Sequence, residues 1–528
     1  MDKISLGFSL AAGLSLISSA GAQQVIQDPA SACSSIASTF TYPNATITSA
    51  EHVPAGTILD SGLSCNQTST VPADICRVGF NVSTSARSGI VAEAWLPVNW
   101  TGRFLSTGNG GLNGCVKYED LAYGSESGFA VVGSNNGHDG ERGTAFYQNE
   151  DVVEDFAWRS IYTETVVGKA MAKAYYSKEL TKSYYIGCST GGRQGFKMAQ
   201  SYPELFDGIL AGAPAIAFNN LTAWSGHFLL ITGSPDSETY LTPEKWSLVH
   251  DDILKQCDGL DGVEDGILED PNLCHYKPVS LQCASDATNT SACLTPVQVT
   301  TVTNIFAPYH GEQGALIYPR IQPGAEIIGA LINFNGQIAP YTEDWFRFAI
   351  LQDPNWDATT LNSSTAALAA AINPSNIQTW EGDLSAFQNK GGKLLTYHGL
   401  MDGVISSDNS PRYYEHVSTT MGLAPSELDS FYRFFRISGL AHCTGGDGAW
   451  NIGQATGGGV GAQKNALQRI IDWVEKGDAP ETVTGVKYVE GDMTKGVDYE
   501  RNHCKYPLRN KFVGPGSYKE VDAWECVP

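Results

Sequence analysis

A serine in a Gly-x-Ser-x-Gly sequence, between a predicted strand and a predicted helix, constrains the fold more than any other feature of the chain. The strand is predicted over residues 183–186, the helix over residues 192–202, and Ser189 lies between them. Glycines at 187 and 191 allow a sharp turn that points the Ser189 hydroxyl outward. We interpret Ser189 as a nucleophile that needs a neighbouring base. A plain glycine-rich turn is the alternative, because the chain has 56 glycines.

Other apolar segments predict strands that alternate with helices. The predicted strands cover residues 91–96, 103–106, 129–133, 208–211, 393–398 and 431–437, and further helices are predicted over 163–180 and 463–475. This alternation is typical of an α/β fold with a mostly parallel sheet. The pattern is interrupted over 220–391, where four cysteines, an acidic glycine-rich run and proline-rich sequence occur. We expect this interval to form a large inserted lid domain over the carboxyl edge of the sheet.

Two polar residues after late predicted strands are candidates for the base and its acid. His442 follows the apolar segment 431–440, and Asp402 follows the strand 393–398. The order serine, acid, histidine is that of an α/β-hydrolase. The acid would accept the Nδ1–H of the imidazole and hold the tautomer whose Nε2 takes the serine proton. Asp408 is the rival acid, and the other late histidines are His398, His416 and His503.

Composition narrows the class of protein. With 528 residues the chain exceeds one ordinary domain, and 42% hydrophobic residues exclude general disorder. The net charge of −23 excludes a nucleic-acid binder of the usual electrostatic kind and disfavours anionic membranes. No segment after the N-terminus reaches the roughly 18 apolar residues of a membrane span. A soluble protein that acts on a neutral substrate fits this composition.

The N-terminus and the cysteines predict secretion. Lys3 precedes an apolar run over 4–17, and small residues lead to Ala22, so residues 1–22 are predicted to be a signal peptide. Twelve cysteines without a C-x-x-C pair predict six disulfides rather than a metal site. They are Cys33, Cys65, Cys76, Cys115, Cys188, Cys257, Cys274, Cys283, Cys293, Cys443, Cys504 and Cys526. Seven glycosylation sequons occur, at Asn44, Asn66, Asn81, Asn99, Asn220, Asn289 and Asn362.

An acyl-transfer site also needs backbone N–H donors for the oxyanion. The amide of Thr190, directly after the nucleophile, is the first candidate. The second is an amide of the glycine-rich loop after strand 103–106, for which we choose Gly110. An ordinary glycine turn is the alternative for this loop. The polar loop 137–140 either faces the site or supports neighbouring loops.

These motifs together resemble the tannase/feruloyl esterase family of fungi and bacteria, and are closest to the fungal type B feruloyl esterases. The resemblance covers essentially the whole chain after residue 22. The matching motifs begin at Glu93, Gly102, Gly137, Gly187, Asp258 and Ser426. It implies Ser189 as nucleophile, His442 as base, Asp402 as orienting acid and a Cys188–Cys443 disulfide. Before the resemblance is considered, each of these two cysteines has other possible partners.

The resemblance also implies that calcium binds in the lid. The acidic run 257–270 resembles an EF-hand loop loosely but misses its strict spacing. Asp258, Asp261 and Asp265, with the carbonyls of Val263 and Ile267, would supply the hard oxygen ligands that calcium requires. A solvated acidic turn is the alternative. The predicted organisation is a signal peptide (1–22), an α/β-hydrolase domain (23–219 and 392–528) and a lid domain with the calcium loop (220–391).

The predicted function is a secreted serine esterase that releases hydroxycinnamic acids, such as ferulate or p-coumarate, from plant cell-wall polysaccharide. Lid aromatics at Trp224, Phe228, Tyr240, Trp345 and Phe346 either clamp the acyl group or pack in the core. A tannase that cleaves galloyl esters is the nearest alternative. Related tannases are typically longer and are often cut at a dibasic site in the lid; no Lys/Arg pair occurs over 220–391. An inactive, calcium-stabilised extracellular binding protein is the alternative from another class.

Overall fold

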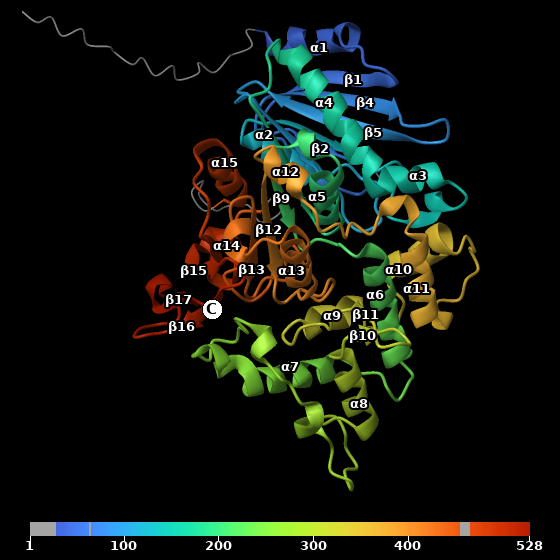
Figure 1. Cartoon of the computed structure of the whole chain (residues 1–528), viewed down its shortest axis with the longest axis vertical. Helices are drawn as coiled ribbons and strands as arrows, with labels where there is room; N and C mark the ends of the chain where they lie inside the picture. The colour runs from blue at the N-terminus through green and yellow to red at the C-terminus, as the bar shows by residue number, and fades with distance from the viewer. Residues whose placement is uncertain (1–27, 63–64, 455–464) are drawn as a thin grey trace, which may run out of the picture.

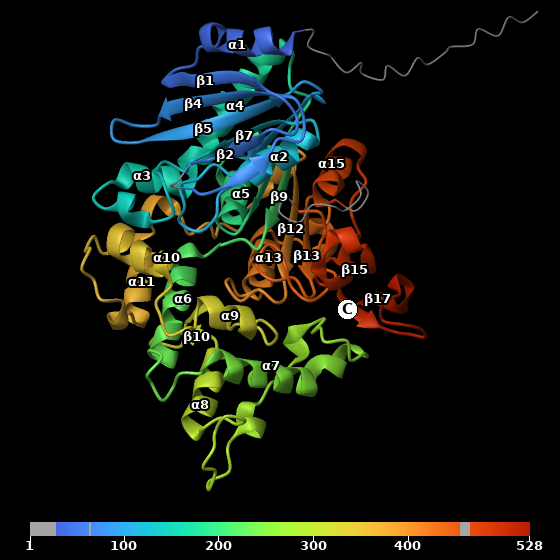
Figure 2. The same cartoon turned by 180° about the vertical axis from the view of Figure 1, so that it is seen from behind.

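A computed structural model describes residues 28–62, 65–454 and 465–528. The predicted signal peptide over 1–22 lies outside the described residues, as does the start of the helix predicted over 463–475. Figure 1 and Figure 2 show an elongated molecule, with helix α1 at one end and helices α7 and α8 at the other.

In the described ranges, nine strands form one mixed sheet in the order β1-β4-β5-β7-β6-β8-β9-β12-β13. These strands are β1 (Ala45–Val53), β4 (Ile75–Ser83), β5 (Gly89–Pro97), β6 (Arg103–Thr107), β7 (Ala130–Ser134), β8 (Lys182–Cys188), β9 (Gly208–Gly212), β12 (Lys393–Gly399) and β13 (Tyr432–Ile437). Each of the seven strands predicted from the apolar segments is present, with its ends shifted by a few residues.

The sheet is parallel in one part and antiparallel in the other. Strands β7, β6, β8, β9, β12 and β13 pair in parallel, whereas β1, β4, β5 and β7 pair antiparallel. The strand predicted over 91–96 is therefore antiparallel to its neighbours. Because the carboxyl ends of parallel strands meet at one edge, the loops after β6, β8, β12 and β13 converge there.

Helices cover both faces of the sheet. Around it lie α1 (Pro29–Thr39), α2 (Tyr118–Glu126), α3 (Glu150–Glu154), α4 (Ser160–Tyr176), α5 (Thr190–Ser201), α12 (Ser385–Asn389), α13 (Asn409–Met421), α14 (Pro425–Leu428) and α15 (Ala466–Lys476). In α15 the side chains of Leu467, Ile470, Ile471 and Trp473 are buried in a core shared with the sheet. Residues at that spacing form the apolar stripe of an amphipathic helix. Gly477, with a positive φ of 75°, ends the helix.

The interval between β9 and β12 is largely helical rather than irregular. It holds α6 (Phe218–Thr232), α7 (Pro243–Cys257), α8 (Pro296–Ile305), α9 (Glu326–Ile332), α10 (Pro340–Asp344) and α11 (Ser363–Ile372), with the short strands β10 (Tyr309–His310) and β11 (Leu316–Tyr318). The sequence did not show these helices because proline begins three of them, at the position where a helix tolerates it.

Packing in this interval does not follow the predicted boundary at 391. Leu384 and Phe387 pack with Phe196 of α5 in the core beside the sheet. By contrast, Trp224, Phe228 and Trp345 belong to another core cluster, which the interval shares with residues outside it such as Phe146 and Phe156. The segment that begins with α12 therefore packs with the sheet, although it precedes residue 391.

The C-terminal part adds two short sheets and a disulfide. Strand β14 (Thr482–Tyr488) pairs with β15 (Val497–Cys504), and β16 (Arg509–Phe512) pairs with β17 (Trp524–Val527). Near the N-terminus, β2 (Ile58–Asp60) pairs with β3 (Thr68–Thr70). A Cys504–Cys526 disulfide joins β15 to β17.

Candidate active site

Ser189 lies at a strained turn between β8 and α5. Its backbone has φ 64° and ψ −122°, a combination that L-residues rarely adopt and that stores strain at functional turns. A Cβ at position 187 would lie 2.7 Å from the carbonyl oxygen of Gly191, so only glycine allows this close approach. The Ser189 residue is partly exposed. The turn therefore presents a hydroxyl at the carboxyl edge of the sheet.

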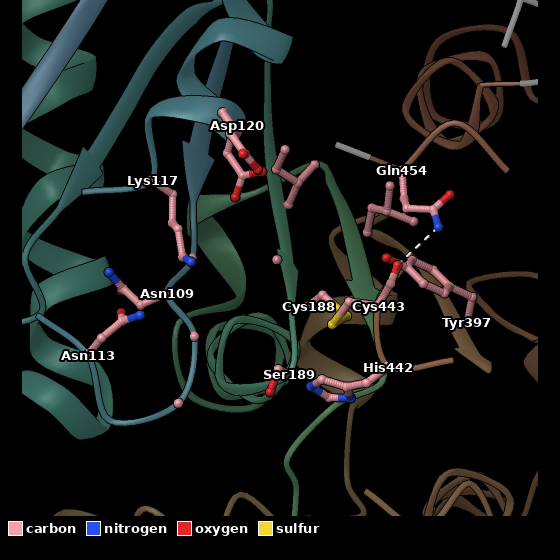
Figure 3. Close-up of a pocket in the computed structure, with 17 residues that line it drawn as sticks. Asn109, Asn113, Lys117, Asp120, Cys188, Ser189, Tyr397, His442, Cys443 and Gln454 are labelled. Atoms are coloured by element: carbon pink, nitrogen blue, oxygen red, sulfur yellow. Dashed lines mark hydrogen bonds between the residues drawn. A yellow bond between two sulfur atoms is a disulfide. The ribbon is translucent and has the colours of Figure 1, made fainter. Parts of the chain in front are cut away.

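His442 and Asp402 lie at the same edge, after β13 and β12. The Nδ1–H of His442 donates to Asp402 Oδ2 over 2.7 Å. The His442 side chain is 21% exposed, while Asp402 is fully buried. Figure 3 shows the ring of His442 beside Ser189, and both residues line one cavity. The three residues chosen from the sequence are thus brought together, although Ser189 and His442 lie 253 positions apart in the chain.

Asp402 has further partners that hold it in the ionised form. His398 Nε2 donates to the same Oδ2 over 3.1 Å, and the amides of Val404 and Ile405 donate to Oδ1 over 2.8 and 2.9 Å. Burial alone would raise the pKa of Asp402. The charge of His442 and the hydrogen bonds from both histidines outweigh burial and bring the pKa below its usual value.

The rival residues have other roles. Asp408 lines a separate cavity and makes no hydrogen bond to His442 in the described structure. His416 contacts the carbonyl of Trp380, and His503 is buried against the carbonyl of Ala449. His398 bonds to Asp402 and to Ser410 Oγ, so it is a neighbour of the candidate triad.

The glycine loop after β6 lies next to Ser189. Gly110 and Gly111 line the same cavity as Ser189, and Thr190 Oγ1 donates to the Gly111 carbonyl over 2.8 Å. Among the described residues, no hydrogen bond uses the backbone amide of Thr190 or Gly110. Both amides are therefore available to an oxyanion.

Buried polar side chains fix this loop, and sequence reasoning missed them. Gln194 Oε1 accepts from the Asn109 amide over 3.0 Å, and Asn109 Nδ2 donates to the carbonyls of Cys115 and Ser134. His138 of the polar loop 137–140 contacts the Leu112 carbonyl at 2.7 Å and is buried. This loop therefore supports the glycine loop, which was one of its two predicted roles.

A disulfide links the nucleophile loop to the histidine loop. Cys188 bonds to Cys443, with a Cα–Cα distance of 6.0 Å and 255 positions between them. The carbonyl of Cys443 accepts a hydrogen bond from Gln454 Nε2 over 3.0 Å. The bond implied by the family resemblance is present in the structure, and it joins the residue before Ser189 to the residue after His442.

Two cavities flank Ser189. The larger, of about 360 Å³, has both polar and apolar residues on its wall, and Figure 3 shows Lys117, Asp120, Tyr397 and Gln454 around it. The smaller is mainly apolar and is lined by Leu112, Phe218, Leu221, Thr222, Tyr341, Val404 and Ile405. None of the five aromatic residues predicted to clamp a ligand lines either cavity. Trp224, Phe228, Trp345 and Phe346 are buried in the core, so core packing is their role.

The acidic loop is compact and partly paired. Asp258 accepts from the amides of Asp265 and Gly266, and Asp261 Oδ1 accepts from the Val263 amide. Asp265 also pairs with Arg501 at 3.2 Å. Within the described residues, no group of three or more His, Cys, Asp or Glu side chains is arranged to hold a metal.

One atom of this loop nevertheless lacks a partner. Asp261 Oδ2 is buried and makes no hydrogen bond. Burial, with the neighbouring carboxylates of Glu269, Asp265 and Asp258, raises the pKa of Asp261 to about 7. A cation at this oxygen would relieve that unfavourable environment, and the residues fit calcium if backbone carbonyls complete the ligand set.

The remaining sequence features can be placed individually. All twelve cysteines are paired, as Cys33–Cys76, Cys65–Cys115, Cys188–Cys443, Cys257–Cys274, Cys283–Cys293 and Cys504–Cys526. Six sequon asparagines are exposed, whereas Asn220 is half-buried and donates to the Ile317 carbonyl over 2.9 Å. Among the helices described, none has the length and apolar character needed to cross a membrane.

Comparison with known proteins places this site in a family. The family described as "Tannase and feruloyl esterase" matches residues 75–527. A "Probable feruloyl esterase B-2" of Neosartorya fischeri is 52% identical, over 100% of both chains. A crystal structure of feruloyl esterase B from Aspergillus oryzae is 49% identical and covers 95% of this chain and 100% of its own, with a TM-score of 0.91.

A more distant structure shares the fold alone. The tannin acyl hydrolase from Aspergillus niger is 22% identical and covers 93% of each chain, with a TM-score of 0.72. The family match covers most of this chain, and relatives near 50% identity extend over nearly all of it. The chain therefore belongs to the tannase and feruloyl esterase family.

Proposed function

We propose that the protein is a serine carboxylic ester hydrolase, a feruloyl esterase that releases hydroxycinnamic acids from esterified plant cell-wall polysaccharide. The observation that carries this function is the convergence of Ser189, His442 and Asp402 at the edge of the sheet, beside two free backbone amides. Relatives near 50% identity that are named feruloyl esterase B favour this activity over galloyl ester hydrolysis. An inactive binding protein would not need this set of groups.

In the proposed mechanism, Ser189 Oγ attacks the ester carbonyl while His442 Nε2 takes the hydroxyl proton. The Thr190 and Gly110 amides stabilise the developing oxyanion. Asp402 holds the ring through Nδ1–H and stabilises the imidazolium. His442 then protonates the departing sugar alcohol and leaves an acyl-enzyme. Water, activated by the same histidine, hydrolyses this intermediate and releases the acid.

Parallel kinetics on methyl ferulate, p-coumarate, caffeate, sinapate and gallate test this function. We expect turnover of the hydroxycinnamates to exceed that of gallate, and Ser189→Ala to lower kcat by roughly a millionfold. Ser189→Ala should keep the wild-type melting temperature, because the side chain is small and partly exposed. Preferred hydrolysis of methyl gallate would favour a tannase, and wild-type turnover in a purified Ser189→Ala sample would refute the assigned nucleophile.

The apolar pocket beside Ser189 fits the aromatic acyl group, and the larger cavity, with Lys117, Asp120 and Gln454 on its wall, fits the sugar. We expect Leu221→Trp, which fills the apolar pocket, to lower kcat/KM for methyl ferulate at least roughly tenfold, by analogy with other pocket-filling changes. Hydrolysis of p-nitrophenyl acetate should change little, since acetate does not reach the pocket. Equal losses on both esters would show that the acyl group binds elsewhere.

The architecture belongs to this proposal as well. An α/β-hydrolase domain over 23–219 and 392–528 would carry the catalytic loops, and the interval 220–391 would act as a lid. Support comes from Leu221 and Tyr341 of that interval, which line the apolar pocket. Asp258, Asp261 and Asp265, with the carbonyls of Val263 and Ile267, would hold a structural calcium ion. Six disulfides and exposed sequons support an extracellular location.

A further inference from the structure

Another open cavity, of about 540 Å³, lies between three segments that are distant in sequence. The β10–β11 hairpin and the residues after it form one wall, the start of α13 forms another, and residues 506–509 form the third. We name this cavity the arginine groove after Arg320, Arg412, Arg436 and Arg509, which line it.

The concentration of arginine is unusual for this chain. The protein has a net charge of −23, yet four guanidinium groups line one groove. Arg436 pairs with Asp270 at 3.2 Å. Among the described residues, Arg320, Arg412 and Arg509 form no ion pair. Within the described part of the chain these three cations make no direct ion pair; Asp408 and Glu415 interact with Arg320 and Arg412 through charge alone, and Arg412 donates to Asn409 Oδ1 over 2.9 Å.

Most hydrogen-bond donors of these arginines remain available. Arg320 makes one long contact to Gln322 Oε1 at 3.5 Å, and Arg509 makes one to the Pro528 carbonyl at 3.3 Å. Each guanidinium carries five N–H donors. In the described structure the acids of the groove accept no hydrogen bond from Arg320, Arg412 or Arg509: Asp270 is paired with Arg436, and Glu415 accepts from the Tyr506 hydroxyl. Burial raises the pKa of Asp408, although the charge of Arg320 opposes that rise.

The chemistry of the groove indicates its ligand. A guanidinium group binds a carboxylate through two parallel hydrogen bonds. The ring of Tyr506 and the prolines at 308, 319, 411 and 507 add apolar surface against which the C–H face of a sugar ring can pack. A carboxylate carried by a sugar ring satisfies both features, whereas an unsubstituted neutral sugar satisfies only the second.

We propose that the arginine groove is an accessory site for uronate residues of the polysaccharide. This inference rests on the proposed function, since it assumes a polysaccharide substrate. The groove is joined to the active site by one loop: Asp402 bonds to His442, and Asp408 lines the groove. Six residues span at most about 22 Å, so the groove lies near the acid of the candidate triad.

Isothermal titration of the full-length protein tests the proposal. The probes are a glucuronate-substituted xylo-oligosaccharide, the same oligosaccharide without glucuronate, and inorganic phosphate. We expect the acidic oligosaccharide to bind and the other two to bind far more weakly. Arg320→Gln and Arg509→Gln should each weaken binding at least roughly tenfold, the loss expected for a hydrogen bond to a charged group. Arg87→Gln, at an exposed arginine outside the groove, should not.

Methyl ferulate, which lacks a uronate, separates failure of this proposal from failure of the proposed function. All three arginine variants should hydrolyse it at the wild-type rate, which also shows that they fold. Equal affinity for acidic and neutral oligosaccharides, tighter binding of phosphate, no binding at all, or unchanged affinity in Arg320→Gln and Arg509→Gln would overturn the uronate site. If methyl ferulate is not hydrolysed while the acidic oligosaccharide binds, the proposed function fails and the groove remains a uronate site.

Discussion

Asp402 accepts two hydrogen bonds on each carboxylate oxygen, and one of them comes from a histidine outside the candidate triad. Ser410 Oγ contacts His398 Nδ1 at 2.7 Å, which leaves His398 Nε2–H to donate to Asp402. His398 is fully buried. We infer that His398 is a positioning residue that shares the negative charge of Asp402 with His442.

Replacing His398 tests this role. In His398→Leu the charge on Asp402 Oδ2 is directed to His442 alone, which stabilises the imidazolium form of the base. Because the base acts when neutral, the acid limb of the kcat/KM–pH profile should move to higher pH, and kcat should fall at least roughly tenfold. His398→Gln keeps an N–H donor. It should therefore restore much of the lost kcat and return the acid limb toward its wild-type position. A lower kcat with an unmoved acid limb in both variants would mean that His398 serves packing alone.

At the scale of elements, the site depends on how two loops are held together. The Cys188–Cys443 bond joins the end of β8 to the loop after β13, across the intervening strands β9 and β12. Both Ser189 and Cys443 have a φ of 64°. The bond therefore holds two strained turns at the spacing that proton transfer needs.

The double variant Cys188→Ala/Cys443→Ala should lose both stability and activity. The chain-entropy model gives about 5 kcal/mol for a loop of this length. Small misplacements of reacting groups lower rates by up to about 100-fold. The loss of kcat should therefore exceed the loss caused by the unfolded fraction of the variant. The measurement is kcat at a temperature where circular dichroism shows the variant folded. Wild-type kcat under that condition would show that the bond stabilises the fold without positioning the site.

Sequence patterns predicted the parallel strands and the loops after them well, because buried strands and sharp glycine turns leave local signals. Ser189, His442 and Asp402 were each found by their place after such a strand. The residues that hold the catalytic loops in place could not be predicted in this way. Gln194 fixes the Asn109 amide, and His398 contacts Asp402 across a strand end, through contacts that depend on the fold. Three helices of the 220–391 interval were missed because prolines obscured their beginnings.

At the scale of the whole molecule, the acidic loop connects the interval between β9 and β12 to the C-terminal sheets. Arg501 of β15 bonds to Glu269 at 2.6 Å and to Asp265 at 3.2 Å, and its guanidinium lies 3.4 Å from the ring centre of Trp524. Both ion pairs are buried. Arg501 lies more than 230 positions after the two acids, so a residue of the C-terminal part holds the acidic loop. A cation in this loop would stabilise both parts together.

We therefore expect calcium removal to lower thermal stability more than catalysis. A ligand that binds only the folded state stabilises it by about 2.7 kcal/mol at a hundredfold excess over Kd. Chelation, or Asp261→Ala, should lower the melting temperature while kcat on methyl ferulate changes little below it. Asp286→Ala, at an exposed acid outside the acidic loop, is the control. Identical melting with and without chelator, together with no calcium by elemental analysis, would exclude the metal site.

The Cys188–Cys443 bond has one more consequence, for a chain that meets proteases. The covalent ring that it closes contains the entire interval between β9 and β12. A single cut in that interval outside the Cys257–Cys274 and Cys283–Cys293 loops, for example in the exposed stretch 312–316, would open the ring without releasing either piece. The nicked enzyme would keep its nucleophile and its base in one molecule and would separate into two fragments only under reducing conditions.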